Sequence, residues 1–492
     1  MFLKTKKRIC ELIDTVSEML GVICRLSNST SAILDCSDAI QVIYSELLLE
    51  EHTPQKTLTK CQIIREKLNL ILDGSTKVTQ NTIEELGNNL FELKNEFQSE
   101  IKPKLKILFL PYKAAMWDSL ETIYEAAVKD EDCIAKVVPI PYYKLSQNEA
   151  TPSYEGESFP RNIPIIHYDN FNLEEEQPDI IFVHNIYDQY NTITRVFEQY
   201  FTSNLKKYTD MLVYVPYHIS SFIPPKPGGR SMAYNIPTIS NVDKIVLAAD
   251  FLIDSARRDG IDLNKLLALG SPKFDAMLKT LTEDTQYPSD WKEKIKGKTV
   301  YLLNTGCLFF SVDPFVKVNV IANILNIPNI DKDSALIWRP HPLTKISILK
   351  YTPYLADYYD RLTNLYIKKE SGMYNNIIID ETDSYLPALK VADVLISSDG
   401  SLLRAFLATG KKVLFLDKEM PAGSMIPANA FYYFYDSNEP WYDLVKKFPD
   451  GYDPLAQNRK GLAAKVYANA DGTCGTKVYQ SIKESVLKTN TI

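Results

Sequence analysis

The chain has 492 residues, enough for about two to four domains with large cores. Its net charge of −7 argues against a dedicated nucleic-acid binder, which would show a basic surface. Seven scattered cysteines without a C-x-x-C pair favour reduced thiols over a disulfide framework or a zinc site. No apolar run approaches the roughly 18 residues of a membrane span, and the start does not read as a signal peptide. We therefore expect a cytoplasmic protein.

Residues 1–101 are predicted to form an antiparallel helical bundle or coiled-coil hairpins. Apolar residues recur every three or four positions in four successive segments, which is the spacing of one helix face; the first stripe runs from Ile9 to Ile23. Pro54 and Gly74 stand where the third helix would begin and end. No catalytic constellation is visible here. We expect a structural role or formation of a homo-oligomer.

The basic cluster near the start leaves two interpretations. Lys4, Lys6, Lys7 and Arg8 are suited to contact with anionic lipid. The solvated start of a surface helix is the more ordinary interpretation and the one that we favour.

Residues 102–285 predict a first Rossmann-like unit, on the acceptor side. Short apolar runs alternate with helical stretches after Pro103, as in a parallel sheet with crossover helices. The expected strands are 106–110, 134–140, 179–183, 211–215, 244–248 and 266–269, and the expected helices include 192–206 and 249–259. Two long loops, 141–164 and 217–240, are of a length that is usually functional or mobile. Within the second, K-P-G-G-R (226–230) is either a basic lid or a plain surface loop.

Residues 286–492 predict a second Rossmann-like unit with closing helices. A strand near 299–303 opens it, and four apolar runs follow at 335–338, 377–379, 394–396 and 413–416. In open α/β sheets, ligands bind at the carboxyl ends of the strands. Polar residues stand at those positions, namely Asn304, Thr305, Gly306, Arg339, His341, Ser398, Asp399, Gly400 and Ser401. Because a helix should begin at the last four, its free N–H groups would suit a phosphate. We expect a donor-binding edge here, although a surface turn and a helix cap explain the same residues.

Two such α/β units with facing strand ends make a cleft, which is the GT-B glycosyltransferase architecture. The predicted fold class is therefore α/β, a GT-B-like pair of Rossmann-type domains preceded by the N-terminal helical bundle. The architecture alone does not identify the reaction.

Six stretches across both units carry a resemblance to a known family. They are L-P-Y-K-A-A-M-W-D-S-L-E (110–121), D-I-I-F-V-H-N-I-Y-D-Q-Y-N (179–191), K-Y-T-D-M-L-V-Y-V-P-Y (207–217), L-G-S-P-K-F-D (269–275), L-L-N-T-G (302–306) and L-I-W-R-P-H-P (336–342). Together they resemble the CDP-glycerol glycerophosphotransferases, the teichoic-acid primases and polymerases. The resemblance implies transfer of glycerol phosphate, or a related polyol phosphate, from a CDP-linked donor to an acceptor hydroxyl. CMP would be the leaving group, and no cofactor is implied.

The resemblance also implies a partner and a place. The acceptor would be a polyol phosphate or glycan of a teichoic-acid, capsule or other cell-envelope polymer, lipid-linked or free. The protein would then be peripheral at the inner face of the cell membrane. Two departures stand against the family pattern: a W-H-G-T-P-type motif is absent, and the D-x-S-S element appears as Asp399-Gly400-Ser401-Leu402.

Only five histidines are available as a general base. His52 and His167 do not follow strands, whereas His184 and His218 each end an apolar run where a cleft would open. We expect the base to be His184 first, because Asp188 follows at a distance suited to orienting its ring, and His218 second. A structural strand-end histidine is the alternative for each. The expected acceptor-side contacts are Lys113, Asp118, Asn185 and Asp188.

Three functions remain open from the sequence. The first is the CDP-linked transfer, in which His341 and Arg339 would neutralise the diphosphate. The second is a GT-B glycosyltransferase that uses a nucleotide sugar. The third is an inactive GT-B scaffold whose helices recruit partners.

Overall fold

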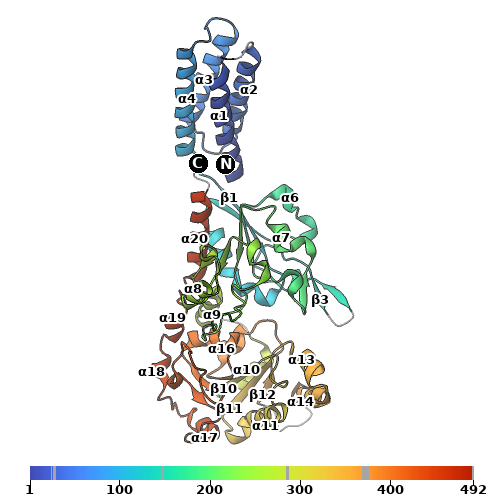
Figure 1. The fold of residues 1–492 in the computed structure, drawn as a ribbon. Coiled ribbons are helices and arrows are strands. Elements are labelled where there is room, and N and C mark those ends of the chain that lie inside the picture. Colours follow the sequence, from blue (N-terminus) through green and yellow to red (C-terminus); the bar gives the residue numbers. More distant parts are fainter. Residues whose placement is uncertain (24, 26–28, 146–148, 284–286, 368–375, 490–492) are drawn as a thin grey trace.

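The computed structural model describes residues 1–23, 25, 29–145, 149–283, 287–367 and 376–489. It has three parts in a row: a helical bundle, a first α/β unit and a second α/β unit (Figure 1). Cys24 lies outside the described residues, and the six described cysteines are free.

The N-terminal part is the predicted antiparallel bundle. Its four helices are α1 (Leu3–Ile23), α2 (Thr30–Leu47), α3 (Gln55–Leu72) and α4 (Gln80–Glu100). The apolar stripes read from the sequence face one another in a single core, in which Ile40, Leu68 and Leu86 are fully buried. Thr79 caps α4 by accepting a hydrogen bond from the Thr82 N–H at 3.2 Å. The amphipathic pattern is therefore satisfied within the bundle.

The bundle is fastened to the first unit through its basic N-terminal turn. The Leu3 N–H donates to the Lys104 carbonyl at 3.0 Å, and the Leu3 side chain is buried in the core of the first unit. Lys7 pairs with Asp210 at 2.6 Å, and Lys6 donates to the Ile101 carbonyl at 2.5 Å. Of the lysines expected either to meet lipid or to stand in solvent, Lys7 thus ties the bundle to the first unit, whereas Lys6 bonds the end of α4 within the bundle.

The first unit is built on a parallel six-stranded sheet in the order β2-β1-β5-β7-β8-β9. The strands are β1 (Leu105–Leu110), β2 (Cys133–Val137), β5 (Ile180–Val183), β7 (Met211–Tyr214), β8 (Lys244–Val246) and β9 (Leu266–Leu267). The helices around the sheet are α5 (Glu121–Val128), α6 (Leu173–Glu176), α7 (Thr202–Leu205), α8 (Phe251–Arg258) and α9 (Pro272–Thr282). All six predicted strands are present, and the central strands β5 and β7 are buried at every position, as expected in a parallel sheet covered on both faces.

The predicted helix 192–206 is wrong. The segment begins with the strand β6 (Thr194–Val196), which pairs with β3 (Tyr142–Leu145), and β3 also pairs with β4 (Ala150–Ser153). Helical structure is confined to the 3-10 turn Glu198–Tyr200 and to α7. The β-branched run T-I-T-R-V favours a strand, and part of the expected loop 141–164 supplies its partners.

The second unit has a parallel sheet in the order β12-β11-β10-β13-β14-β15. The strands are β10 (Thr299–Thr305), β11 (Ser334–Pro340), β12 (Ile377–Ile379), β13 (Val394–Ser397), β14 (Lys412–Phe415) and β15 (Tyr432–Tyr433). Helices α10 (Ser289–Ile295), α11 (Pro314–Leu325), α12 (Ile327–Ile330), α13 (Thr344–Tyr351), α14 (Ala356–Ile367), α15 (Leu386–Val391), α16 (Ser401–Phe406), α17 (Trp441–Lys447), α18 (Ala456–Arg459) and α19 (Leu462–Val466) complete it. The strands around the predicted donor edge are thus confirmed.

The last helix, α20 (Cys474–Thr489), packs on the first unit rather than closing the second. Asp275 at the start of α9 accepts from the Gly475 N–H at 2.7 Å and the Cys474 N–H at 3.2 Å. Gly270 adopts φ +105°, and a Cβ there would lie 2.1 Å from the Ala468 carbonyl oxygen, so a side chain at this chain crossing is excluded. Although α20 falls within the predicted second unit, 286–492, it thus contributes its buried residues to the core of the first unit.

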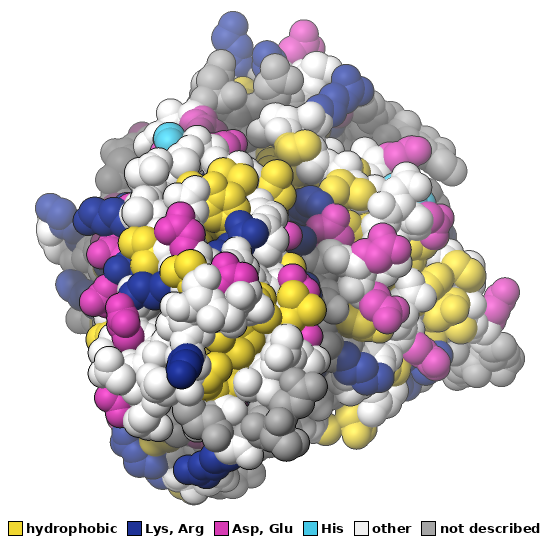
Figure 2. Space-filling model, turned by 90° about the horizontal axis from the view of Figure 1, so that it is seen from above, with side chains coloured by type: hydrophobic (Ala, Val, Ile, Leu, Met, Phe, Trp, Pro, Cys, Tyr) yellow, Lys and Arg dark blue, Asp and Glu magenta, His cyan; other side chains and the backbone are white. Residues whose placement is uncertain are grey.

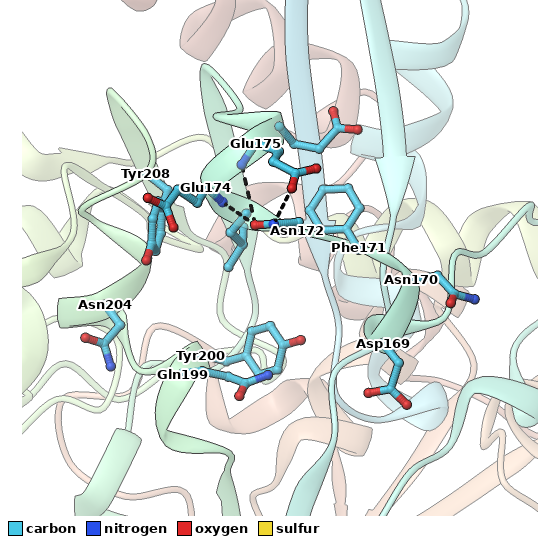
Figure 3. A pocket seen from close by; sticks show the side chains of 12 residues that line it. Asp169, Asn170, Phe171, Asn172, Glu174, Glu175, Gln199, Tyr200, Asn204 and Tyr208 are labelled. Carbon is cyan, nitrogen blue, oxygen red and sulfur yellow. Dashed lines mark hydrogen bonds between the residues drawn. The ribbon is translucent and has the colours of Figure 1, made fainter.

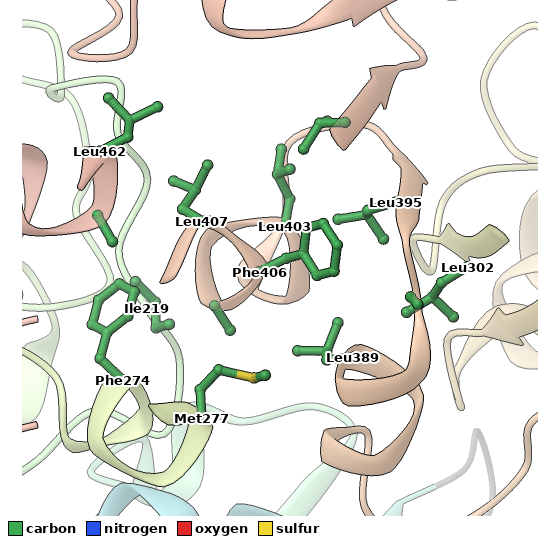
Figure 4. Close-up of a cluster of buried hydrophobic side chains, with 14 of the residues drawn as sticks. Ile219, Phe274, Met277, Leu302, Leu389, Leu395, Leu403, Phe406, Leu407 and Leu462 are labelled. Atoms are coloured by element: carbon green, nitrogen blue, oxygen red, sulfur yellow. The ribbon is translucent and has the colours of Figure 1, made fainter. Parts of the chain in front are cut away.

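The two α/β units share one hydrophobic core. Ile219, Phe274 and Met277 of the first unit pack against Leu403, Phe406 and Leu407 of the second (Figure 4). All of these side chains are buried. Apolar packing across the boundary fixes how the strand ends of the two sheets face each other.

Candidate functional site

A cleft of about 650 Å³ lies where the two units meet, a size typical of small-molecule sites. We call it the interunit cleft. Its second-unit wall includes Asn304, Gly306, His341 and Ser398, and Lys273 of the first unit also lines it. The expectation that strand ends of the second sheet come together at one edge is met.

His341 presents one free nitrogen at this edge. The ring Nδ1 of His341 accepts a hydrogen bond from the Leu343 backbone N–H at 3.1 Å. The backbone N–H of His341 donates to the Thr305 carbonyl at 3.0 Å. None of the described residues bonds Nε2. Burial, with Lys113 and Arg339 nearby, lowers the pKa of His341 below its usual value. The neutral ring therefore carries its proton on Nε2 and can donate it to a ligand in the cleft.

Arg339 lines the cleft, but its guanidinium is already engaged. It pairs with Asp380 at 2.6 Å and donates to the Thr382 carbonyl at 2.9 Å, and its side chain is 12 % exposed. The predicted bidentate hold on a diphosphate would compete with these bonds. In this structure Arg339 fixes the loop after β12.

At the end of β10, the Asn304 side chain is accessible from the cleft and the Thr305 side chain is buried. Asn304 donates to Ser397 Oγ at 3.0 Å, and both residues line the cleft together with Gly306. Thr305 is fully buried, and its hydroxyl accepts from Trp338 Nε1 at 3.2 Å. The Thr305 side chain is therefore turned away from the cleft, because successive strand residues point to opposite faces.

The segment Ser398–Ser401 reaches the cleft but is largely committed to protein contacts. Ser398 Oγ bonds Asp417 at 3.3 Å, and Asp399 forms an ion pair with Arg404 at 2.8 Å. Ser401 Oγ accepts from the Ile219 N–H at 3.2 Å. The helix that begins there, α16, spans 6 residues, so the dipole expected to hold a phosphate is short.

Lys113 and His218 of the first unit lie near the cleft, because Lys113 acts on the pKa of His341 and the residue after His218 bonds Ser401. The Lys113 ammonium lies 5.3 Å from the Tyr142 ring centre, and burial lowers its pKa. His218 follows β7 and is half-buried, and no described residue hydrogen-bonds to its ring. Burial, with Arg404 and Lys273 nearby, lowers the pKa of His218 to about 4. It is thus neutral at physiological pH, with its ring free to take a proton.

His184, our first choice for the base, is fully buried with both ring nitrogens engaged. Nε2 accepts from the Tyr112 N–H at 3.1 Å, and Nδ1 lies 3.3 Å from Ser119 Oγ. Burial lowers the pKa of His184 to about 3. A ring without a free nitrogen cannot receive a proton from an acceptor, so the geometry gives His184 the structural role instead.

Asn185 and Asp188 are also buried and bond their own unit. Asn185 accepts from the Tyr187 N–H at 3.0 Å. Asp188 accepts from the Thr202 N–H at 3.0 Å and from the Thr202 hydroxyl at 2.6 Å. The expectation that Asp188 orients His184 is wrong, because its carboxylate fixes the start of α7 instead. Neither residue stands open to an acceptor.

A buried network that the sequence analysis missed joins the two walls. Lys273 donates to both oxygens of Asp118 at 2.6 Å, and the Tyr385 hydroxyl donates to Asp118 Oδ2 at 2.6 Å. Lys273 is 4 % exposed and Asp118 8 %. Asp118 is therefore an ion-pair partner rather than a free acceptor contact. Lys273 lies within the L-G-S-P-K-F-D stretch that carries the family resemblance. The local sequence pattern around Lys273 contains no signal for its distant partner Asp118.

A second hollow, of about 770 Å³, lies on the first unit and does not fit a phosphate. It is lined by carboxylates and amides, and Asn172 there bonds the N–H groups of Glu174 and Glu175 (Figure 3). His167 pairs with Asp169 at its edge, at 3.6 Å. Carboxylates repel an anionic donor, which favours the interunit cleft.

Other surface features give little further guidance. Seen from the bundle end, basic and acidic side chains are interspersed (Figure 2). Among the described residues, no group of three His, Cys, Asp or Glu side chains is arranged to hold a metal ion. No helix in the described part of the chain is long and apolar enough to cross a membrane.

Comparison with known proteins places the fold. No protein-family model and no curated protein matches the sequence. Among solved structures, a Listeria monocytogenes protein described as a UDP-N-acetylglucosamine 2-epimerase has a TM-score of 0.51 at 14% identity, over 78% of this chain and 97% of that chain. The wall teichoic acid polymerase TagF has a TM-score of 0.48 at 12% identity, over 88% of this chain and 99% of that chain. Such identities speak for the fold alone, and the predicted GT-B-like α/β class is confirmed.

Proposed function

We propose that the protein transfers glycerol phosphate, or a related polyol phosphate, from a CDP-linked donor to an acceptor hydroxyl of a cell-envelope polymer. The observation that carries the proposal is the interunit cleft, which His341 lines with a free Nε2, together with the free ring of His218, whose neighbour Ile219 bonds the cleft residue Ser401. Phosphoryl transfer needs this pairing of a donor for the phosphate and a base for the acceptor.

In the proposed reaction the donor diphosphate lies against the second unit. The backbone at Gly306 and Gly400 has no side chain to keep a phosphate at a distance, and no heavy atom lies within 4 Å of where a Cβ would stand. His341 donates from Nε2 to a phosphate oxygen. Lys113 of the first unit adds a cation, since it is close enough to lower the pKa of His341. These groups offset the charge that develops on the phosphates.

The acceptor approaches from the first unit, where His218 takes its proton. The acceptor oxygen forms a bond to the phosphorus that carries glycerol, and the bond from that phosphorus to the bridging oxygen breaks. The electron pair stays on the bridging oxygen, which leaves as part of CMP. The acceptor proton ends on His218, whose proximity to the cleft follows from the Ile219–Ser401 bond one residue later.

The decisive experiment is isothermal calorimetry with CMP, CDP, UDP and GDP on the full chain, followed by a CMP-release assay with CDP-glycerol and a polyol-phosphate acceptor. We expect cytidine nucleotides to bind at least tenfold more tightly than the others. The likeness to a UDP-N-acetylglucosamine 2-epimerase favours one second candidate, an enzyme acting on a UDP-linked sugar. Preference for UDP would support that candidate, and absence of all nucleotide binding would support a scaffold.

A further inference from the structure

The three residues directly after His218 are held by side chains of the second unit. The Ile219 N–H donates to Ser401 Oγ at 3.2 Å, and the Ile219 carbonyl accepts from Arg404 at 2.5 Å. The Ser220 carbonyl accepts from the Tyr467 hydroxyl at 3.0 Å. Both backbone groups of Ile219 are therefore bonded across the unit boundary.

Arg404 is the centre of this set of contacts. Its guanidinium pairs with both oxygens of Asp399, at 2.9 Å and 2.8 Å, while a third nitrogen reaches Ile219. Asp399 in turn accepts from the Ser221 hydroxyl at 3.0 Å. Arg404 is 13 % exposed and Asp399 21 %, so solvent competes little for these bonds. A planar guanidinium can hold a carboxylate and a carbonyl at once, which an ammonium cannot do in the same geometry.

The same stretch is anchored by packing. Ile219 is fully buried in the core that the units share, beside Leu403 and Phe406 of α16 (Figure 4). The backbone of Ile219 is thus fixed by hydrogen bonds and its side chain by apolar contacts. His218, one residue earlier, can move only as far as this anchor permits.

We propose that Arg404 is a positioning residue that sets the place of His218 beside the cleft, so that a base of the first unit is aligned by the second unit. This inference rests on the proposed function, in which His218 takes the acceptor proton. It goes beyond that function because it makes proton transfer dependent on docking of the two units.

The charges around His218 provide a readout that simple loss of packing would not change. Arg404 with its partner Asp399 faces His218 from α16, and Lys273 with its partner Asp118 faces it from α9. Tyr217 lies beside it, with ring centres 5.5 Å apart. Burial is the largest cause of the lowered pKa of His218, and the positive charges of Arg404 and Lys273 lower that pKa further. Removing the charge of Arg404 should therefore raise that pKa.

The experiment compares Arg404→Gln, Arg404→Lys and the matched surface control Arg257→Gln, whose ion pair with Asp254 is exposed. For each full-length variant, CMP release is measured against pH beside nucleotide affinity and thermal stability. We expect Arg404→Gln to lower kcat about a hundredfold, as misplacement of a reacting group by about 1 Å does. The acid limb of the pH–rate profile of Arg404→Gln should move to higher pH, because the pKa of His218 rises. Arg404→Lys should lower kcat but leave the acid limb of the pH–rate profile where it is in the wild type. Arg257→Gln should match the wild type in both respects.

The outcomes separate this inference from the function on which it rests. Suppose that His218→Ala is inactive, while folded Arg404→Gln keeps the wild-type kcat and the wild-type acid limb of the pH–rate profile. The assignment of His218 as the base is then retained, and the positioning role of Arg404 is wrong. A lower melting temperature with an unchanged limb in both Arg404 variants would also reduce Arg404 to a packing role. If His218→Ala keeps the wild-type rate, the base assignment itself fails, and this inference fails with it.

Discussion

Tyr385 of the second unit, which lines the interunit cleft, donates a hydrogen bond of 2.6 Å to Asp118 of the first unit. Asp118 also accepts two bonds from Lys273, whose ammonium lies 4.9 Å from the centre of the Tyr385 ring. One buried carboxylate thus satisfies a cation of its own unit and a phenol of the other. The closed arrangement of the cleft depends on this contact as well as on the shared core.

We predict that Asp118→Asn destabilises the protein far more than Tyr385→Phe. Loss of the carboxylate leaves the buried Lys273 charge unpaired, which typically costs about 3–5 kcal/mol. Loss of the Tyr385 hydroxyl removes one hydrogen bond, worth about 0.5–1.5 kcal/mol net. Denaturant unfolding of each variant measures the difference, with Asp254→Asn in an exposed ion pair as the control. Equal losses for Asp118→Asn and Tyr385→Phe would contradict the importance of the ion pair.

We predict that His341→Ala lowers turnover about a hundred- to a thousandfold, because a preorganised donor to developing charge is worth about 2.7–4 kcal/mol. His52→Ala is the matched control, since His52 lies exposed in the loop between α2 and α3. The measurement is CMP release at saturating donor. Wild-type turnover in a folded His341→Ala variant would remove His341 from the site.

We predict that His218→Ala abolishes turnover and leaves donor affinity within a few-fold of wild type. The acid limb of kcat/KM should lie below the ordinary histidine range, because the pKa of His218 is lowered to about 4 in the free protein. In the pH profile of kcat the acid limb should lie at higher pH, since a bound diphosphate places negative charge near the His218 ring and raises its pKa. Full pH profiles of both parameters test this, and identical limbs would contradict it.

We predict that His184 makes stability rise with pH over a defined window. Burial lowers its folded pKa to about 3, whereas an unfolded histidine titrates near 6.5. Between these values the unfolded state binds the additional proton, so the stability contribution is lost as pH falls through the window. The slope contributed is about 1.4 kcal/mol per pH unit.

The test compares the unfolding free energy of wild type and His184→Gln at several pH values between 4 and 6. The difference between the two proteins isolates His184, because Asp188, whose pKa burial raises to about 6, acts in the opposite direction in both. Parallel pH profiles would show that His184 is charged in the folded protein.

We predict that removal of residues 1–103 leaves nucleotide affinity within a few-fold but lowers the melting temperature of the α/β part. Among the described residues of the bundle none lines the interunit cleft, whereas Leu3 is buried in the core of the first unit. Leu3→Ala in the full chain should reproduce much of the loss, about 2–5 kcal/mol. Complete loss of nucleotide binding in a folded truncated chain would contradict this separation.

The sequence by itself determined the elements and the fold class. Its helical stripes, such as Ile40 and Leu68, match the bundle core, and the buried runs around Leu336 and Leu395 match central strands of the second sheet. These assignments follow from local periodicity, which fixes which face of an element avoids water. It also placed His341 at the cleft, because strand ends of a parallel sheet share one edge.

Only the tertiary structure decided which polar residues are free to act. His184 and His218 have the same strand-end signature, yet one ring is enclosed by Tyr112 and Ser119 and the other remains open. Periodicity carries no information about partners distant in sequence, such as Lys273 and Tyr385 on Asp118 or Asp380 on Arg339. Burial and long-range pairing set both the pKa and the accessibility of a side chain, and both arise only when the two units pack together.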